Sequence, residues 1–294
     1  MNYKTIKKEI KSPLRYPGGK TRAIKQIIPL VPSFKEYREP FVGGASVFFA
    51  LKQRLPRNIK YKINDLNNDL YCFWKVARDK NEELVEAIQL IKDKKKDGKN
   101  LCDYYRENIG NNEFDRAVRF FVLNRITFSG LADSGGYSEQ AFKRRFTQSS
   151  IVRIRLIEPV LKDVIITNDD YENHIKDGGN KVFIFLDPPY WKATKKRLYG
   201  KDGDLHLSFD HERFAKIIKQ CKHKWLITYD DCEVVRNLFK FAYIYEWELQ
   251  YGMNNYKQTH AKKGKELFIS NYEIDEKISK NTKLVETKLT DFIS

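Results

Sequence analysis

The chain has 294 residues, 41% of them hydrophobic and including 19 Phe, 17 Tyr and 4 Trp, so it can bury a sizeable core, which excludes extensive disorder. Its 55 Lys and Arg outnumber 39 Asp and Glu, and the net charge of +16 indicates an anionic partner, nucleic acid first and an anionic membrane second. No apolar run approaches the roughly 18 residues that a membrane-spanning helix needs, which weakens the membrane alternative.

The cysteines and histidines do not form a metal-binding pattern. The four cysteines are far apart, without a Cys-x-x-Cys pair, and the five histidines are dispersed. The basic stretch from Met1 to Arg15 lacks the apolar segment of a signal peptide. We therefore expect a reduced, cytoplasmic protein without a structural metal, in which the thiols act as small buried hydrophobes.

Short apolar runs alternate with amphipathic stretches along the chain, which predicts an α/β sheet. The predicted strands are Glu36–Phe41, Lys60–Asn64, Val164–Asn168, Val182–Leu186, Lys224–Tyr229, Tyr243–Gln250 and Glu266–Ser270. The predicted helices are Ala45–Arg54, Asn67–Arg78, Glu82–Lys92, Glu113–Phe128, Ser149–Leu161, Asp210–Gln220 and Asp231–Phe239.

The segment between the second and third predicted strands is unusually long. About a hundred residues there have the pattern of helix and loop, whereas a single crossover helix needs only about a dozen. We therefore expect a catalytic domain formed by residues 1–69 and 163–294, with a helical domain inserted at residues 70–162. Basic residues of the insertion, set among aromatic ones, favour a nucleic-acid surface over solvated faces: Lys94–Lys96, Lys143–Arg145, Arg153 and Arg155.

The first motif with chemical meaning runs from Arg38 to Phe48, where a predicted strand enters a Gly43-Gly44 turn and then a helix. Glycine lets a ligand approach the backbone closely, and a helix N-terminus favours a carboxylate or phosphate. An ordinary strand-to-helix turn has the same pattern. A dinucleotide fingerprint requires Gly-x-Gly-x-x-Gly, and Phe48 stands where the third glycine would fall, which disfavours a nicotinamide enzyme.

The second motif is the acid that follows the next predicted strand. Asp65 lies 21 residues after Gly44, the spacing at which α/β nucleotide sites place a carboxylate on a ribose diol. The alternative is that Asp65 or Asn67 caps the helix that follows.

The third motif is Asp-Pro-Pro-Tyr at residues 187–190, directly after the apolar strand. Two prolines restrict the backbone and remove two amide donors, which leaves carbonyl groups to accept hydrogen bonds from a substrate amine. Tyr190 or Trp191 offers a face on which a flipped base can stack. A rigid turn with core aromatics is the structural alternative.

These motifs together resemble the Dam-like N6-adenine DNA methyltransferases, the D12 class of alpha type, in which a recognition insertion precedes the catalytic tetrad. The resemblance extends from about Ser12 to Asn271 and includes Leu14–Lys20, Asn168–Tyr171 and Lys265–Asn271. It implies a Rossmann-like S-adenosylmethionine-dependent methyltransferase sheet with an inserted helical target-recognition domain, and double-stranded DNA as partner. The catalytic residues that it implies are Asp187, Pro188, Pro189 and Tyr190.

The resemblance also implies two sets of binding residues. The S-adenosylmethionine pocket is expected to contain Tyr16, Gly18, Gly19, Lys20, Glu39, Pro40, Phe41, Gly43, Gly44, Ala45, Ser46, Asp65, Asp170, Tyr171 and Asp187. DNA is expected to contact Asn124, Arg125, Ser129, Gly130, Lys143, Arg144 and Arg145. After Leu131 the chain departs from the best-known members and reads Ser134-Gly135-Gly136-Tyr137-Ser138, so the target sequence cannot be transferred.

Some assignments keep alternatives. Lys20 lines the cofactor pocket or reaches DNA, and Asp170 is preferred to Asp169 for the adenine side of the cofactor. Asp230 or Asp231 is interpreted as a helix cap. Three charges after the tetrad contact phosphate or are solvated loop charges: Lys195, Lys196 and Arg197.

The implied chemistry is direct methyl transfer to an amine. The exocyclic nitrogen of adenine is a poor nucleophile because its lone pair is delocalised, and Asp187 with the Pro188 carbonyl would accept its two hydrogens and expose that lone pair. The base must be flipped out of the duplex and held against Tyr190. No metal is required.

The alternatives are transfer to cytosine N4, to RNA or to a protein amide, and a catalytically inactive DNA-binding relative. Aspartate at the first tetrad position favours adenine, and the basic insertion disfavours a protein amide. A cognate restriction endonuclease is a candidate partner, and we expect a monomer or weak dimer.

Overall fold

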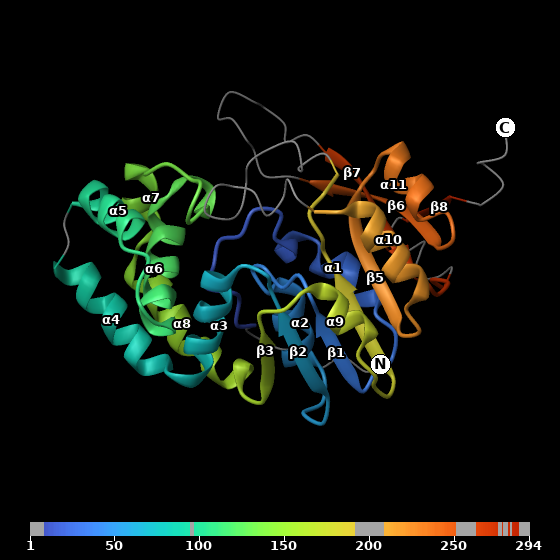
Figure 1. The fold of residues 1–294 in the computed structure, drawn as a ribbon, viewed down its shortest axis with the longest axis horizontal. Helices are drawn as coiled ribbons and strands as arrows, with labels where there is room; N and C mark the ends of the chain where they lie inside the picture. The colour runs from blue at the N-terminus through green and yellow to red at the C-terminus, as the bar shows by residue number, and fades with distance from the viewer. Residues whose placement is uncertain are drawn as a thin grey trace.

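The computed structural model describes residues 9–94, 97–191, 209–250, 263–275, 278, 282 and 284–287. One eight-stranded sheet crosses the molecule, and a group of helices lies beyond one edge of it (Figure 1). The seven predicted strands are all present, with ends shifted by a few residues, which confirms the α/β fold, whereas β8 was not predicted. The strands are β1 (Glu36–Glu39), β2 (Lys60–Asn64), β3 (Val164–Thr167), β4 (Val182–Leu186), β5 (Lys224–Asp230), β6 (Tyr243–Gln250), β7 (Lys263–Ser270) and β8 (Val285–Thr287).

The strand order is β3-β2-β1-β4-β5-β7-β6-β8, parallel from β3 to β5 and antiparallel beyond β5. All residues of the central strand β4 are buried. Phe183 and Phe185 belong to the hydrophobic cluster on one face, and Val182, Ile184 and Leu186 to the cluster on the other. A parallel strand covered on both faces explains the continuous apolar run in its sequence.

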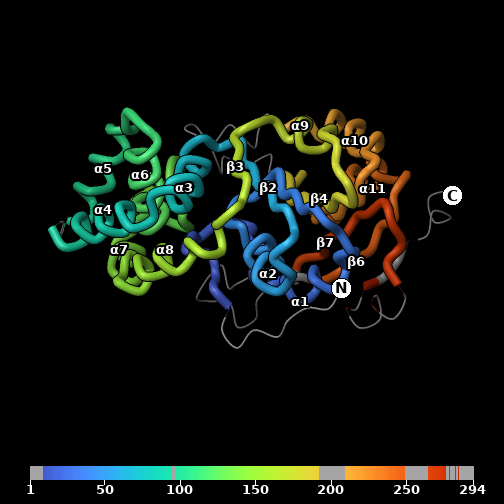
Figure 2. Tube along the Cα trace, turned by 90° about the horizontal axis from the view of Figure 1, so that it is seen from below, coloured from blue at the N-terminus to red at the C-terminus, as the bar shows by residue number. Residues whose placement is uncertain are grey.

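Helices cover both faces of this sheet. α1 (Ile24–Ile27) and α2 (Ser46–Arg54) lie on one side, and α9 (Tyr171–Lys176), α10 (His211–Gln220) and α11 (Glu233–Leu238) on the other (Figure 2). Of these helices, α2, α10 and α11 were predicted. α1 has only 4 residues, too few for a recognisable 3.6-residue period, and α9 was missed as well.

Between β2 and β3 the structure describes only helices and loops. α3 packs against α6 at the centre of this region, where the rings of Phe73 and Phe121 stack 5.8 Å apart. The sequence analysis did not predict α5 and α7. It also placed the end of α6 two residues too late: the helix ends at Ile126 because Thr127 adopts extended geometry and pairs with Tyr137. The helices are α3 (Asn68–Asp79), α4 (Asn81–Lys94), α5 (Gly98–Glu107), α6 (Glu113–Ile126), α7 (Glu139–Arg145) and α8 (Gln148–Leu161).

The strand order creates one special position in the sheet. The chain passes from β1 to β2 and β3 on one side of β1, and then returns to place β4 and β5 on its other side. The loops that follow β1 and β4 therefore lead in opposite directions from the carboxyl ends of these neighbouring strands. Ligands of open α/β sheets bind at such a position. Glu39 ends β1, Asp65 follows β2 and Asp187 follows β4, so the fold brings three predicted site acids to one edge.

Candidate active site

Asp187 has a partner on each carboxylate oxygen. Lys20 Nζ lies 2.6 Å from Oδ2, and the Thr228 hydroxyl donates to Oδ1 at 2.7 Å. The same Nζ donates to the Gly18 carbonyl at 2.8 Å. Because the Lys20 side chain is only 4% exposed, solvent screens this ion pair little. The Asp187 carboxylate is therefore fixed in orientation, with a nitrogen donor already bound to one oxygen.

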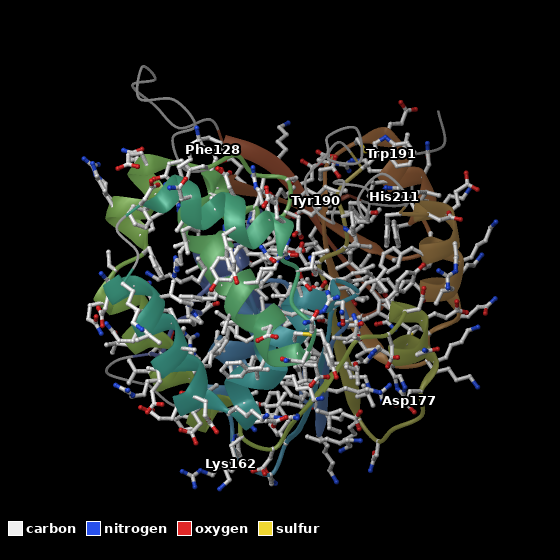
Figure 3. The ribbon with its side chains drawn as sticks, turned by 60° about the vertical axis from the view of Figure 1, so that its left-hand side comes forward. Phe128, Lys162, Asp177, Tyr190, Trp191 and His211 are labelled. Atoms are coloured by element: carbon white, nitrogen blue, oxygen red, sulfur yellow. The ribbon has the colours of Figure 1, made fainter. Side chains whose placement is uncertain are left out.

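The Tyr190 ring lies beside this ion pair. Lys20 Nζ is 5.0 Å from the ring centroid, within the range of a cation–π contact. In Figure 3, Tyr190 and Phe128 lie toward the same end of the molecule, and Lys162 and Asp177 lie toward the opposite end. The structure directs the Lys20 ammonium at Asp187 and Tyr190, and both roles considered for Lys20 stay predictions.

The Gly43-Gly44 turn requires glycine because Tyr16 packs directly against it. A Cβ atom on Gly43 would lie 2.7 Å from Tyr16 Cε1, and one on Gly44 would lie 2.9 Å from Tyr16 Cβ. Gly43 also has a φ of +44°, in the left-handed region. The indole N–H of Trp74 donates to the Gly43 carbonyl at 3.1 Å, so the turn is held from a second direction.

The N-terminal motif meets the start of α2 as well. The Gly19 N–H donates to the Tyr16 carbonyl at 3.0 Å, which closes the loop before Lys20. The hydroxyls of Thr21 and Ser46 lie 2.9 Å apart. The structure thus brings together two predicted motifs that are distant in the sequence.

Asp65 binds the glycine turn. Its Oδ2 accepts from the Gly43 N–H at 2.9 Å and its Oδ1 from the Asn67 N–H at 3.0 Å. Burial raises the pKa of Asp65 to about 6, although these hydrogen bonds oppose the shift. Of the two capping alternatives, Asn67 caps α3, since its side chain accepts from the N–H groups of Asp69 and Leu70.

Glu39 is a buried acid at the end of β1. Its side chain accepts a hydrogen bond from the Tyr37 hydroxyl at 2.7 Å, and the residue is 3% exposed. Burial raises the pKa of Glu39 to about 8, and Asp187 contributes to the rise, whereas Lys20 opposes it. A cation bound here would therefore favour the ionised form.

Asp170 and Tyr171 follow β3 on the far side of the site. The ring centroids of Tyr171 and Phe41 are 5.3 Å apart. Asp170 caps α9 by accepting from the Glu172 N–H at 2.9 Å, and its carboxylate pairs with Arg213 at 3.1 Å. These two structural partners of Asp170 were not predicted, and its contact with the cofactor stays a prediction.

Asn64 is a site residue to which no separate role was assigned. Its amide, 1% exposed, donates to the Pro40 carbonyl at 3.0 Å and to the Asp169 carbonyl at 2.9 Å. Its Oδ1 accepts from the Thr167 hydroxyl at 2.9 Å and from the Asp169 N–H at 2.8 Å. One side chain therefore ties together the loops after β1 and β3. The available signal was an amide directly before Asp65, at the end of a predicted strand.

Asn124 and Arg125, two of the predicted DNA contacts, are buried and bind protein backbone. Asn124, 1% exposed, accepts from the Arg15 N–H at 3.0 Å and donates to the carbonyls of Arg15 and Gly130 at 2.6 and 2.9 Å. Arg125, 4% exposed, donates to the Pro13 carbonyl, and burial lowers its pKa to about 10. Gly130 is buried too. These residues hold the N-terminal segment, whose distance in the sequence hid the contact, and their contact with DNA stays a prediction.

The remaining predicted DNA contacts are at least partly exposed. Next to them lies Phe128, an aromatic side chain that is 67% exposed and was not singled out from the sequence. The chain turns sharply there, with a φ of +57° at Ser129 and +78° at Gly130. The exposed or half-buried predicted contacts are Ser129, Lys143, Arg144 and Arg145.

Some expectations concern other parts of the chain. Lys95, Lys96, Lys195, Lys196 and Arg197 lie outside the described residues. Among the residues that the structure describes, no helix has the length and apolar character needed to cross a membrane. In the same residues, no group of three or more His, Cys, Asp or Glu side chains is arranged to hold a metal ion.

An α/β sheet of this order, with a glycine turn and an Asp-Pro-Pro-Tyr corner at adjacent strand ends, defines a methyltransferase that acts on an amine. Residues 16–253 match the model of the D12 class N6 adenine-specific DNA methyltransferases, and the chain belongs to this family. The predicted activity, methylation of adenine N6 in DNA, is confirmed by this membership.

Curated relatives agree with this assignment. The chain is 28% identical over 236 residues to Type II methyltransferase M.MjaIII of Methanocaldococcus jannaschii, covering 72% of this chain and 80% of the relative. It is 25% identical over 282 residues to Type II methyltransferase M1.LlaDCHI of Lactococcus lactis subsp. cremoris, covering 88% and 94%. It is 26% identical over 245 residues to a DNA adenine methylase of Haemophilus influenzae, covering 78% and 82%.

Gly43→Ala should destabilise the protein by about 2 kcal/mol, because alanine is strained at this φ and its methyl group overlaps the Tyr16 ring. The free energy of unfolding in urea measures this loss. Gly178→Ala is the matched control, since a Cβ there has no neighbour within 4 Å. Equal stability of the two variants would contradict the packing of Tyr16 on the turn.

Asn124→Ala should lower the free energy of unfolding by about 3 kcal/mol, because the backbone groups of Arg15 lose buried partners. Asn108→Ala removes an exposed amide that donates to the Tyr104 carbonyl, and it should cost less than about 0.5 kcal/mol. If Asn124→Ala proved as stable as this control, the inference that Asn124 holds the N-terminal segment would be refuted.

Proposed function

We propose that the enzyme transfers the methyl group of S-adenosylmethionine to N6 of an adenine turned out of duplex DNA, with residues 187–190 as the catalytic corner. One observation carries this proposal: a nitrogen donor, Lys20 Nζ, lies 2.6 Å from Asp187 Oδ2 and 5.0 Å from the centroid of the Tyr190 ring. An aminopurine offers the matching features, an N–H donor on a flat ring. The corner is thus suited to an exocyclic amine.

The residues at the strand ends suit S-adenosylmethionine, which carries a carboxylate, two cationic groups, a ribose diol and an adenine. The Gly43-Gly44 turn has no side chains, because a Cβ there would meet Tyr16, so it offers only backbone at the start of α2. A helix N-terminus favours a carboxylate, and this position therefore suits the carboxylate of the cofactor. The buried acid Glu39 suits a cationic group, and Asp65 suits the diol, since each of its oxygens keeps a second lone pair. Leu66, 58% exposed, offers an apolar surface to the adenine. When bound, the cofactor supplies an electrophilic methyl group on a positively charged sulfur.

The residues of the corner then activate the amine. In this proposal the amine takes the place of Lys20 at Asp187 Oδ2, while the Thr228 hydroxyl keeps the carboxylate oriented. The Pro188 carbonyl accepts the second hydrogen, so the nitrogen becomes pyramidal and directs its lone pair outward. Methyl transfer would break the carbon–sulfur bond and leave a neutral thioether, and the methylated nitrogen would be cationic and still carry both hydrogens. Asp187 need not be a strong base, because one of these hydrogens is then acidic and passes to its carboxylate. Positioning and electrostatics therefore supply most of the acceleration.

Duplex DNA is expected to lie across the end of the molecule that carries Tyr190 and Phe128 (Figure 3). The exposed Phe128 ring can stack on bases, and the exposed Lys143 and Arg144 can contact phosphate. Extruding the base costs a few kcal/mol, and phosphate contacts make the affinity strongly salt-dependent. Two relatives are named Type II methyltransferases, which supports a cognate restriction endonuclease as a partner. The expectation of a monomer or weak dimer stays a prediction.

The proposal is tested by incubating the protein with methyl-labelled S-adenosylmethionine and either duplex DNA or RNA, followed by digestion to nucleosides. The expected labelled product is N6-methyl-2′-deoxyadenosine, formed from DNA alone. Label in methylcytidine, or label from RNA alone, would contradict the proposed acceptor.

Asp187→Ala should lower the methyl-transfer rate about a thousandfold, because the amine loses its acceptor, while DNA affinity stays close to that of the unchanged protein. Single-turnover kinetics and a DNA-binding titration measure the two quantities. Asp177→Ala is the matched control at the opposite end of the molecule (Figure 3). Persistence of transfer in Asp187→Ala would remove this residue from the catalytic corner.

Cofactor binding should release a proton from Glu39. Its pKa of about 8 keeps it protonated at pH 7, and a bound cation favours ionisation, so affinity rises with pH and levels off above 8. Calorimetry in two buffers of different ionisation enthalpy counts the protons released on binding. At pH 7, Glu39→Gln should release about one proton fewer than the unchanged protein. An identical proton count in both proteins would show that Glu39 does not sense the cofactor.

A further inference from the structure

Two buried acids bind the end of the catalytic tetrad. Asp230 ends β5, and Glu266 lies directly opposite it on the antiparallel strand β7. Glu266 Oε2 accepts from the Tyr190 hydroxyl at 2.9 Å, and Asp230 Oδ1 accepts from the Trp191 N–H at 2.8 Å. The N-cap position of α11 is Cys232, so the interpretation of Asp230 or Asp231 as the helix cap was wrong. We call this pair the two-acid clamp.

The position of the clamp follows from the chemistry of the tetrad. Pro188 and Pro189 have no N–H groups, so the backbone between Asp187 and Tyr190 cannot be fixed by its own amide donors. The clamp binds the Tyr190 side-chain hydroxyl and the backbone N–H of Trp191, the second N–H after the prolines. The two acids thus hold the residues that directly follow the two positions without backbone donors.

The Tyr190 ring is supported along its face as well as at its hydroxyl. The Tyr229 ring stacks on it with centroids 5.9 Å apart and an interplanar angle of 26°. The Tyr229 hydroxyl and His211 Nδ1 are hydrogen-bonded, and the His211 ring lies 4.9 Å from that of Trp191. Packing alone resists tilting of a ring but tolerates sliding, whereas a hydrogen bond at the far end fixes its position.

We propose that Glu266 is a positioning residue, which holds the plane of the Tyr190 ring in the orientation that receives the extruded base. Glu266 is only 1% exposed, and a carboxylate at such a site is costly unless it is hydrogen-bonded, so its bond to Tyr190 is a strong constraint. The inference rests on the proposed stacking role of Tyr190. It adds to the tetrad a residue from a strand that begins more than seventy positions later in the chain.

A double-mutant cycle between Glu266 and Tyr190 tests the inference. The duplex used contains the site found by mapping modified bases in DNA methylated by the unchanged enzyme. Glu266→Leu and Tyr190→Phe should each slow single-turnover methyl transfer about tenfold, with unchanged Kd for DNA and for S-adenosylmethionine. The double variant should be no slower than Tyr190→Phe, because both changes remove the same hydrogen bond.

Two further variants separate positioning from folding. Glu266→Gln keeps a neutral acceptor and should slow transfer only about threefold, and it should have no effect when Phe replaces Tyr190. Should Glu266→Leu fail to fold, this second cycle decides the question. Glu246→Leu is the matched control on β6, since the Glu246 carboxylate binds Arg236 and lies outside the clamp. Its transfer rate should stay close to that of the unchanged enzyme.

The outcomes distinguish the inference from the proposed function. Two outcomes would overturn the positioning role of Glu266 while leaving the methyltransferase assignment intact. One is a double variant whose rate loss is the product of the two single losses, and the other is a Glu266→Leu enzyme as fast as the control. Failure of the unchanged enzyme to methylate any adenine in DNA would instead overturn the proposed function.

Discussion

The ion pair between Lys20 and Asp187 connects the Asp-Pro-Pro-Tyr segment, our proposed catalytic corner, to a segment 167 positions earlier in the chain. Asn124 of α6 holds the same segment at Arg15, and the Tyr16 ring fills the space against the glycine turn. The helical region, the turn and the catalytic carboxylate are thus joined through one short stretch of backbone. Because a buried charge is costly without its partner, displacement of this stretch would disturb all three.

Three acids at one sheet edge have three electrostatic environments. Asp187 is paired with an ammonium group, Asp65 accepts from two backbone N–H groups, and Glu39 is buried with a pKa of about 8. These environments match the roles that we propose for them: binding an amine, binding a diol and receiving a cation. Carboxylates at equivalent strand ends are therefore suited to the distinct roles that we propose by what surrounds them.

The strands and strand-end acids could be predicted because they rest on local patterns. A strand buried on both faces is a continuous apolar run, and Asp187 directly follows such a run, whereas Asp65 follows the shorter pattern of β2 at a fixed spacing from Gly44. Contacts between distant segments could not be predicted in this way. Asn124 is of a residue type that commonly contacts DNA. Only the fold, which pairs it with Arg15, 109 positions away, shows that it is buried. The bond from Tyr190 to Glu266 depends likewise on the antiparallel placement of β7 beside β5.

The most direct measurement is a crystal structure of the enzyme with a non-reactive analogue of S-adenosylmethionine and a duplex that contains the methylated site. We expect an adenine out of the helix, with its amine on Asp187, its ring on Tyr190 and Lys20 moved from Oδ2. We also expect the analogue to lie against the glycine turn, Glu39 and Asp65. An adenine that remains stacked in the duplex, or an analogue bound away from these strand ends, would contradict the arrangement on which the proposed mechanism depends.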